Sequence, residues 1–273
     1  MIHLPKGQFY GQTTETVYLD GITLTDTAYT HDKVDWHYHE NPYFTFILQG
    51  NLIEGNKKEV HHCPAGTILF HNWQEPHYNI KPKGYTRGFH IELEQKWVDA
   101  FSVDLNALQG NILVSNPKHK LLLYKIFVES KLQDHVSELS IQGLLLEALA
   151  GIHHKEENAL KNNPSWVKKV REFLHDQSSE SISLTQLAQA AGIHPGHLSR
   201  DFSRYFYCSF GEYIRKIKVE QSLTLISNQK QTLTEIAFAC GFADQSHFIR
   251  CFKKVMGISP LAYRKMLLSR ELV

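Results

Sequence analysis

The stretch Leu184-Thr-Gln-Leu-Ala-Gln-Ala-Ala-Gly192 recurs 49 residues later as Leu233-Thr-Glu-Ile-Ala-Phe-Ala-Cys-Gly241. The repeat continues at a spacing of 50 residues: His197, Arg200, Phe202, Ser209 and Tyr213 are matched by His247, Arg250, Phe252, Ser259 and Tyr263. The one-residue difference falls in the turn after each glycine, where an insertion disturbs the structure least. A duplicated unit of helix, glycine turn and helix indicates paired helix-turn-helix modules, which read DNA.

Both units carry signals for where their helices begin and end. The first helix of each begins with a capping box, which is Ser183 with Gln186 in one and Thr232 with Glu235 in the other. Gly192 and Gly241 permit the positive φ of the turn that ends these helices. The second helices are predicted to start at His194-Pro195 and at Asp244-Gln245. Residues 211–227 hold no proline or internal glycine, which predicts one rigid connecting helix between the units.

The second helix of each unit has an apolar face and a polar face. Leu198 with Phe202, and Phe248 with Phe252, are four residues apart and are expected to face the core. The residues left on the outer faces, or placed to reach DNA beside them, are the candidate DNA contacts: Gly196, Ser199, Arg200, Ser203, Arg204, Gln245, Ser246, Ile249, Arg250, Lys253 and Lys254.

The chemistry of these residues suits DNA recognition. A guanidinium can bond guanine in a bidentate manner, which predicts that Arg200 and Arg250 read bases. Arg204, Lys253 and Lys254 are better placed for phosphates, which fix register without reading sequence. A solvated helix face is the alternative for any single residue, but the same outward arginine in two duplicated units favours DNA. If both helices enter one face of the duplex, they are expected to lie about 34 Å apart.

Charge is divided unevenly along the 273 residues. Residues 161–273 carry 16 Lys/Arg and 9 Asp/Glu, whereas residues 1–160 carry 13 and 19. The basic half is therefore the half that a polyanion would bind. The four cysteines show no metal or disulfide spacing, and the sequence shows neither a membrane-spanning apolar run nor a signal peptide. A cytoplasmic protein that does not contact membranes is expected.

The chain is predicted to be an α+β multidomain protein. Short apolar runs separated by Gly and Pro turns predict a small β-barrel over residues 1–94. Helical spacing predicts a helical segment over 95–155, where the stripe of Leu144, Leu145, Ala148 and Ile152 is a candidate for either core or dimer contact. The polar residues 156–163 are predicted to be a linker. Residues 164–273 form the predicted all-α double helix-turn-helix domain.

Residues 166–267 resemble the DNA-binding domain of the AraC/XylS family of bacterial transcriptional regulators. The resemblance rests on Ile236-Ala-Phe-Ala-Cys-Gly-Phe-Ala-Asp-Gln-Ser-His-Phe248 and on Arg250-Cys-Phe-Lys-Lys-Val-Met-Gly-Ile-Ser-Pro260, followed by Tyr263-Arg264. It implies seven helices, with recognition helices near 195–206 and 245–256. Two departures bear on structure: Tyr207 stands at a usual glycine position, and His194 replaces a more usual serine cap.

The N-terminal half resembles the cupin-like sensor domain of many family members. His37-Tyr-His39, Tyr43 and Gly50 follow the first cupin motif with Tyr43 in place of its glutamate, and His77 stands at the histidine of the second motif. Strand alternation places His37, His39 and Tyr43 on one face, where His77 and His90 are able to converge. These five residues are the candidate effector-binding site. Three readings remain open: an effector pocket, a metal site at His37, His39 and His77, and structural histidines only.

The resemblance implies a sequence-specific transcriptional regulator in which a small-molecule effector in the barrel changes binding to double-stranded DNA. A homodimer and contact with RNA polymerase are implied with it, and neither a cofactor nor an enzymatic activity is expected. Two alternatives remain: a metal-dependent cupin enzyme fused to a DNA-binding module, and a constitutive regulator whose barrel only dimerises. Tyr43 at the carboxylate position argues against the enzyme.

Overall fold

The computed structural model describes residues 1–268 except 106–107, 109–110, 115, 158–163, 177–181, 207 and 229. Internal contacts divide the chain into two compact units. One contains Met1–Val114, Tyr124–Leu145 and Lys265–Val273, and the other contains Ser115–Leu123 and Leu146–Arg264. Tyr207 and positions 158–163 of the predicted linker lie outside the described residues, and helix α3 (Ser137–Glu157) covers the first two linker positions.

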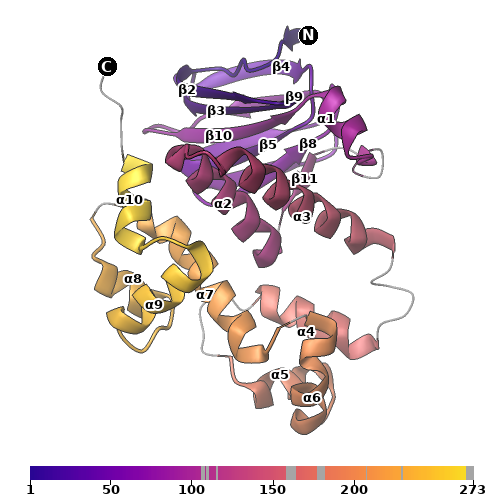
Figure 1. The fold of residues 1–273 in the computed structure, drawn as a ribbon, viewed down its shortest axis with the longest axis vertical. Coiled ribbons are helices and arrows are strands. Elements are labelled where there is room, and N and C mark those ends of the chain that lie inside the picture. The colour runs from indigo at the N-terminus through magenta and orange to yellow at the C-terminus, as the bar shows by residue number, and fades with distance from the viewer. Residues whose placement is uncertain are drawn as a thin grey trace. The chain divides into compact units, whose positions relative to one another are not determined.

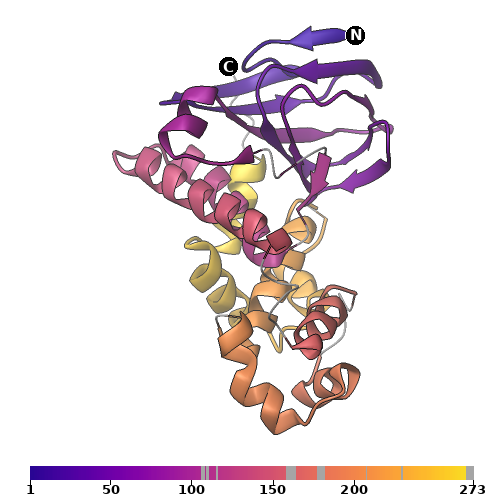
Figure 2. The same cartoon turned by 90° about the vertical axis from the view of Figure 1, so that its right-hand side faces the viewer.

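The first unit is built on two facing β-sheets (Figure 1, Figure 2). Its strands are β1 (Ile2–Leu4), β2 (Gln12–Leu19), β3 (Ile22–Ala28), β4 (Lys33–His39), β5 (Tyr43–Gln49), β6 (Asn51–Gly55), β7 (Val60–Pro64), β8 (Ile68–His71), β9 (His77–Ile80), β10 (Arg87–Leu93) and β11 (Asn111–Leu113). One sheet has the order β1-β4-β9-β6-β7 and the other β11-β8-β5-β10-β3-β2. The predicted N-terminal cupin-like β fold is confirmed.

Strand β5 shows why part of the β fold appears in the sequence as a continuous apolar run. Tyr43 and Thr45 face the space between the sheets, where they line a small polar cavity. Phe46 lies on the opposite face and contacts helix α2 (Pro117–Leu132), with ring centroids 4.4 Å from Tyr124 and 6.2 Å from Phe127. Because both faces are buried, the strand shows no alternation of polar and apolar residues.

Three helices lie within or next to the segment for which helical spacing predicts them. Helix α1 (Gln95–Ala100) directly follows strand β10, and α2 and α3 come later in the chain. Strand β11 between α1 and α2 was not predicted; it is three residues long and pairs with β8 at the sheet edge. In the predicted apolar stripe Leu145 and Ala148 are buried, which assigns them to the core. No helix in the described part of the chain is both long and apolar enough to cross a bilayer.

A buried charge network ties α2 to the six-stranded sheet. Asp26 on β3 accepts two hydrogen bonds from Arg87 on β10, at 2.7 and 2.6 Å, and one from Lys131 on α2 at 2.8 Å. Lys131 also pairs with Glu15 on β2. Burial raises the pKa of Asp26, but the hydrogen bonds and charges of Arg87 and Lys131 outweigh burial and hold that pKa below its ordinary value.

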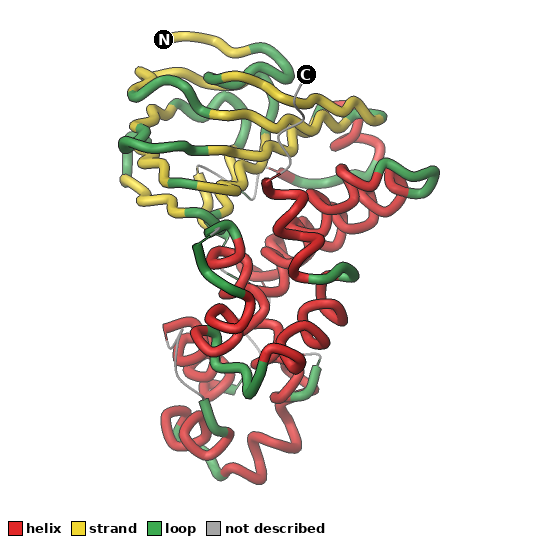
Figure 3. Tube along the Cα trace, turned by 90° about the vertical axis from the view of Figure 1, so that its left-hand side faces the viewer, coloured by secondary structure: helices red, strands yellow, loops and turns green. Residues whose placement is uncertain are grey.

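The described part of residues 164–268 holds seven helices, as the family resemblance implies (Figure 3). They are α4 (Ser165–Asp176), α5 (Leu184–Ala191), α6 (Pro195–Phe206), α7 (Phe210–Ile226), α8 (Leu233–Ala239), α9 (Gln245–Met256) and α10 (Pro260–Leu268). Helices α6 and α9 coincide with the predicted recognition helices, and α7 is the predicted connector. Both capping boxes are present, at Ser183 and at Thr232.

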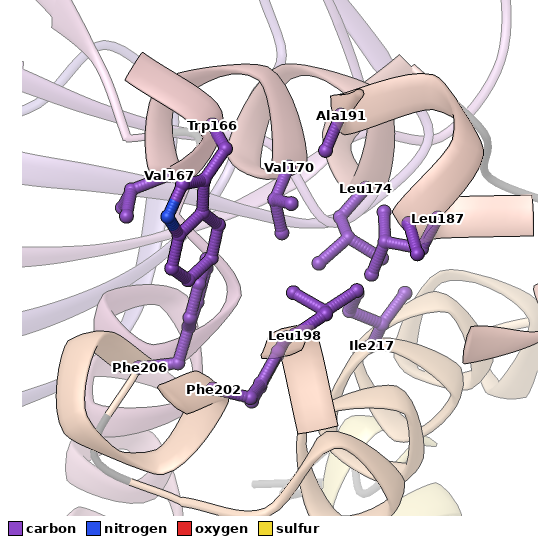
Figure 4. Close-up of a cluster of buried hydrophobic side chains, with 11 residues drawn as sticks. Trp166, Val167, Val170, Leu174, Leu187, Ala191, Leu198, Phe202, Phe206 and Ile217 are labelled. Carbon is purple, nitrogen blue, oxygen red and sulfur yellow. The ribbon is translucent and has the colours of Figure 1, made fainter. Parts of the chain in front are cut away.

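The first helix-turn-helix unit closes over an apolar core shared by α4, α5, α6 and the start of α7. The side chains of Trp166, Val170, Leu187, Leu198 and Phe202 point toward one another in this core (Figure 4). The turn between α5 and α6 is allowed by Gly192, whose φ of 73° is left-handed. The core therefore fixes which face of α6 is turned outward.

Candidate functional site

Helix α6 presents a polar face formed by the predicted residues. Leu198, Phe202 and Phe206 are buried and hold the helix on its core. The candidate DNA contacts on α6 are all exposed: Gly196, Ser199, Arg200, Ser203 and Arg204. Arg204 lies over the Tyr205 ring, 5.6 Å from its centroid, which steadies the guanidinium at the helix surface.

The start of α6 is capped by His194 in place of a serine. Its Nδ1 atom lies 3.1 Å from the backbone nitrogen of Gly196 and accepts a hydrogen bond from it. The imidazole therefore performs the task of the usual hydroxyl cap, which is to satisfy a free N–H at the helix start. Pro195 follows at the first helical position, where its missing N–H costs nothing.

Helix α9 repeats this design with more positive charge. Phe248, Cys251, Phe252 and Met256 are buried. Among the candidates, Ser246, Arg250, Lys253 and Lys254 are exposed, while Gln245 and Ile249 are half-buried. The exposed Arg250 matches the exposed Arg200 of α6, so the duplication places the two guanidinium groups at equivalent positions. Two lysines in the last turn of α9 add charge where phosphate contacts are expected.

Neighbouring elements fix the start of α9. The Asp244 carboxylate caps the helix by accepting from the His247 N–H at 2.6 Å. Thr234 on α8 donates to Oε1 of Gln245 at 2.5 Å, which leaves the Gln245 amide N–H groups available for DNA. Lys218 on α7 donates to the Gly241 carbonyl and lies over the Phe242 ring. Thr234 and Lys218 were not predicted to be positioning residues, because their contacts exist only after folding.

The sensor half contains a buried cluster of imidazole and phenol rings. His37, His39, Tyr43, His77 and His90 are each at most 5% exposed. His37 and His77 have ring centroids 4.2 Å apart, and His39 lies 4.5 Å from Tyr43. The Tyr43 hydroxyl is 3.1 Å from Nε2 of His77. The structure therefore brings four of the five predicted residues directly together.

The fifth residue, His90, lies on the other side of an aromatic side chain. Phe9 stacks on the His90 ring at 3.6 Å and on the His39 ring at 4.7 Å. Nε2 of His90 is 2.8 Å from the Tyr29 hydroxyl. His90, Tyr29, Phe9, His39 and Tyr43 all line the same small cavity between the sheets.

Three further buried polar residues, which were not predicted, adjoin the cluster. They are Glu54 on β6, His71 on β8 and Asn111 on β11. The His71 ring stacks on Tyr43 at 4.3 Å with an interplanar angle of 6°. Glu54 accepts from the Asn111 amide at 2.9 Å, and its second oxygen lies 3.5 Å from Nε2 of His71. Strands β8 and β11 are paired in the six-stranded sheet, and the facing of the two sheets brings β6 to them.

Burial keeps this cluster uncharged near neutral pH. Desolvation lowers the pKa of His77 and that of His90 to about 3, and it lowers the pKa of His39 and His71 well below the ordinary value. Desolvation also raises the pKa of Glu54 to about 8, although the Asn111 hydrogen bond opposes this effect. Neutral imidazoles each offer one donor and one acceptor, so the cluster is suited to bind a polar ligand or a metal ion.

Two sets of residues in the described part of the chain place three ligand atoms within 4.8 Å of one another. The first is His37, His39 and His77, the set proposed from the cupin motif. The second is Glu54, His71 and His77. In the first set, Nδ1 of His37 and of His77 lie 2.9 and 3.0 Å from the backbone carbonyls of Asp35 and Glu75, an arrangement that frees Nε2 for a ligand.

Comparisons with known proteins match both halves of the chain. The model of the AraC-like ligand binding domain matches residues 21–149, and that of a helix-turn-helix domain matches residues 187–266. The HTH-type transcriptional regulator YijO of Escherichia coli is 23% identical over 234 residues, which cover 82% of this chain and 81% of that one. The regulator YdeC of Bacillus subtilis is 25% identical over 260 residues, covering 84% and 86%.

Among solved structures, ToxT from Vibrio cholerae is similar over 90% of this chain and 99% of that one, with 15% identity and a TM-score of 0.37. The C-terminal domain of AraT from Geobacillus stearothermophilus covers 40% of this chain with 28% identity and a TM-score of 0.36. The chain has an AraC-like sensor domain followed by a double helix-turn-helix unit, and it is similar along most of its length to HTH-type regulators. This protein is therefore a DNA-binding transcriptional regulator of the AraC family.

Proposed function

We propose that this chain is a ligand-controlled, sequence-specific regulator that reads two successive major-groove segments with α6 and α9. The observation that carries the proposal is the pair of matching exposed arginines, Arg200 and Arg250, on helices whose opposite faces are buried. A bidentate arginine–guanine contact contributes about 1–3 kcal/mol of discrimination. Two such contacts by one chain define a DNA site of two segments, each with one base pair that is recognised by an arginine of α6 or α9.

The other exposed residues divide between bases and phosphates. Ser199, Ser203 and Ser246 supply short hydroxyl groups beside the arginines, Gly196 allows close approach of the backbone, and Ile249 packs on a thymine methyl. Gln245 donates from its amide, because Thr234 already occupies its oxygen. Arg204, Lys253 and Lys254 contact phosphates and set the register of the protein on the duplex.

In the sensor half, an effector binds between the sheets through His37, His39, Tyr43, His77 and His90. What supports this is that His37, His39, Tyr43 and His90 line one small cavity, which His77 adjoins through the Tyr43 hydroxyl, and that Oδ1 of Asn79 in the same lining has no hydrogen-bond partner among the described residues. A buried polar group without a partner is costly, so a ligand that satisfies it gains affinity and orientation. Binding requires Phe9 to move, because Phe9 stacks on both His39 and His90.

The regulator acts in the cytoplasm as a homodimer and recruits RNA polymerase. Four cysteines without disulfide or metal-ligand spacing agree with a reducing compartment. The exposed apolar residues Val136 and Leu139, the latter 74% exposed, lie at the start of α3 and are available for a dimer contact. A ligand shifts an equilibrium only if it binds the two states with different affinity. We expect the effector to bind one conformation of the sensor more tightly, and thereby to change dimerisation or DNA affinity.

The test is a screen of small polar metabolites by thermal shift of the full chain, followed by DNA affinity and sedimentation with each ligand that binds. A ligand that stabilises the protein and changes its operator affinity supports the proposal, and a His39→Asn variant is expected to lose both effects. His62→Asn, at an exposed position, is the matched control. The same DNA affinity and the same oligomeric state with and without every ligand that binds would refute control by an effector.

A further inference from the structure

We propose that the sensor unit binds one divalent first-row transition metal ion through Glu54, His71 and His77. These residues come from three different strands, β6, β8 and β9, and each side chain is about 1% exposed. Their ligand atoms lie within 4.8 Å of one another. Two imidazoles and one carboxylate form a donor set suited to Zn²⁺, Co²⁺ or Fe²⁺, and three protein ligands leave one coordination position open.

The ring of His71 packs on Tyr43, but its nitrogen atoms are poorly satisfied without a ligand. The side chain is buried, and its polar neighbours in the described part of the chain, Glu54 and Asn111, make no hydrogen bond of good geometry with either ring nitrogen. Buried polar atoms are nearly always paired, so two poorly satisfied nitrogens on one ring require an explanation. An ion at Nε2 would satisfy the atom that faces Glu54.

The distance between His71 and Glu54 also fits a bound ion. Nε2 of His71 and Oε2 of Glu54 are 3.5 Å apart, which is long for a hydrogen bond but close to the separation of two ligands on one ion. For metal–ligand bonds of about 2.0–2.1 Å at a tetrahedral angle, the two ligand atoms lie about 3.4 Å apart. The pair is thus spaced for an ion to lie between its atoms.

Surrounding groups already orient two of the three ligands. The Asn111 amide donates to Oε1 of Glu54 at 2.9 Å and leaves Oε2 free. Nδ1 of His77 lies 3.0 Å from the Glu75 carbonyl, which fixes the tautomer whose Nε2 bears a lone pair. Outer contacts of this kind accompany nearly all metal-bound histidines. The Tyr43 hydroxyl, 3.1 Å from Nε2 of His77, would lie beside the open position.

Charge favours this set over the neighbouring set of His37, His39 and His77. Both use His77, so one ion occupies one set or the other. The histidine set offers no negative charge, whereas Glu54, which burial keeps protonated in the metal-free protein, becomes a carboxylate when a divalent ion replaces its proton. Asp26, the comparable buried carboxylate, is held by Arg87 and Lys131. A divalent cation would give Glu54 the equivalent compensation.

The experiment uses the full-length protein, stripped with chelator, loaded with Zn²⁺ and desalted before elemental analysis. One equivalent of Zn²⁺ per chain is expected. Glu54→Gln and His71→Asn are each expected to weaken Zn²⁺ binding by at least about 100-fold, because each removes a direct ligand. His39→Asn changes the neighbouring set only, and His62→Asn changes an exposed histidine, so both are expected to retain the ion.

A second measurement needs no variant: the wild-type protein is loaded with Co²⁺ and its metal ligands are counted by X-ray absorption. Two histidine ligands and one carboxylate are expected. Circular dichroism and DNA affinity of each stripped variant show whether it folds. The proposal is overturned if the wild type retains no stoichiometric Zn²⁺, or if His39→Asn abolishes binding while His71→Asn does not. DNA binding by the stripped protein is measured separately, so loss of the metal site leaves the regulatory function standing.

Discussion

The buried charge network provides the sharpest test of how the sensor unit is held together, and the perturbation is Asp26→Asn. The carboxylate of Asp26 faces Arg87 through two hydrogen bonds and Lys131 through a third, with the Asp26 side chain 1% exposed. Asparagine is nearly the same size, so the substitution removes charge without opening a cavity. It leaves two cations with only Glu15 as an acidic neighbour in the described part of the network.

The magnitude follows from burial. Removing one partner of a buried ion pair costs about 3–5 kcal/mol, whereas an exposed pair contributes about 0–1 kcal/mol. Asp20→Asn is the matched control, because Asp20 pairs with Lys96 at 3.0 Å with its side chain 84% exposed. Calorimetry of the full chain is expected to show the sensor transition lowered by on the order of 10 °C in Asp26→Asn and by no more than a few degrees in Asp20→Asn. Equal shifts in both variants would refute the argument from burial.

Three further outcomes are expected. Burial lowers the pKa of His77 and of His90 to about 3, so below about pH 6.5 the unfolded chain takes up two protons that the folded sensor does not. Stability is therefore lost as the pH falls from 6.5 toward 3, by roughly 1.4 kcal/mol per histidine per pH unit, while Glu54, whose pKa burial raises to about 8, offsets one such increment per unit down to about pH 4.5. A net loss is expected, and a calorimetric midpoint unchanged between pH 7 and 5 would contradict it. Lys254→Ala is expected to weaken binding to specific and to random DNA alike, and to reduce the slope of log K against log salt by about 1. A loss of affinity confined to the specific site would instead mean that Lys254 contacts bases. His194→Ala is expected to cost about 1 kcal/mol of stability in the first helix-turn-helix unit through loss of the α6 cap, measured by hydrogen exchange, and His194→Ser should restore it.

The parts of this molecule that could be predicted from sequence are those encoded by neighbouring residues. The capping boxes at Ser183 and Thr232 and the turn at Gly192 each depend on a few adjacent positions, so they mark the helices of both units correctly. The outward faces of α6 and α9 follow from helical periodicity alone. Duplication adds a second, independent copy of each signal.

The parts that could not be predicted depend on closure of the sheets. Glu54 and His71 lie on β6 and β8, and no local pattern links them to His77 on β9. His71 is the last residue of an apolar strand, so in the sequence it indicates only where a buried segment ends. Strand β11 is too short to show a period, although its Asn111 orients Glu54. The contacts of Lys218 and Thr234 around α9 likewise exist only in the folded unit.

The most direct test of the central claim is selection of DNA sequences from a random pool by the full-length protein at about 150 mM salt, where non-specific binding is weak. The wild type is predicted to enrich a site of two conserved segments one helical turn, about 10–10.5 base pairs, apart. Arg200→Ala is predicted to relax the sequence of one segment and Arg250→Ala that of the other. A single enriched segment, or a two-segment site that neither substitution changes, would contradict the claim that α6 and α9 both read DNA through these arginines.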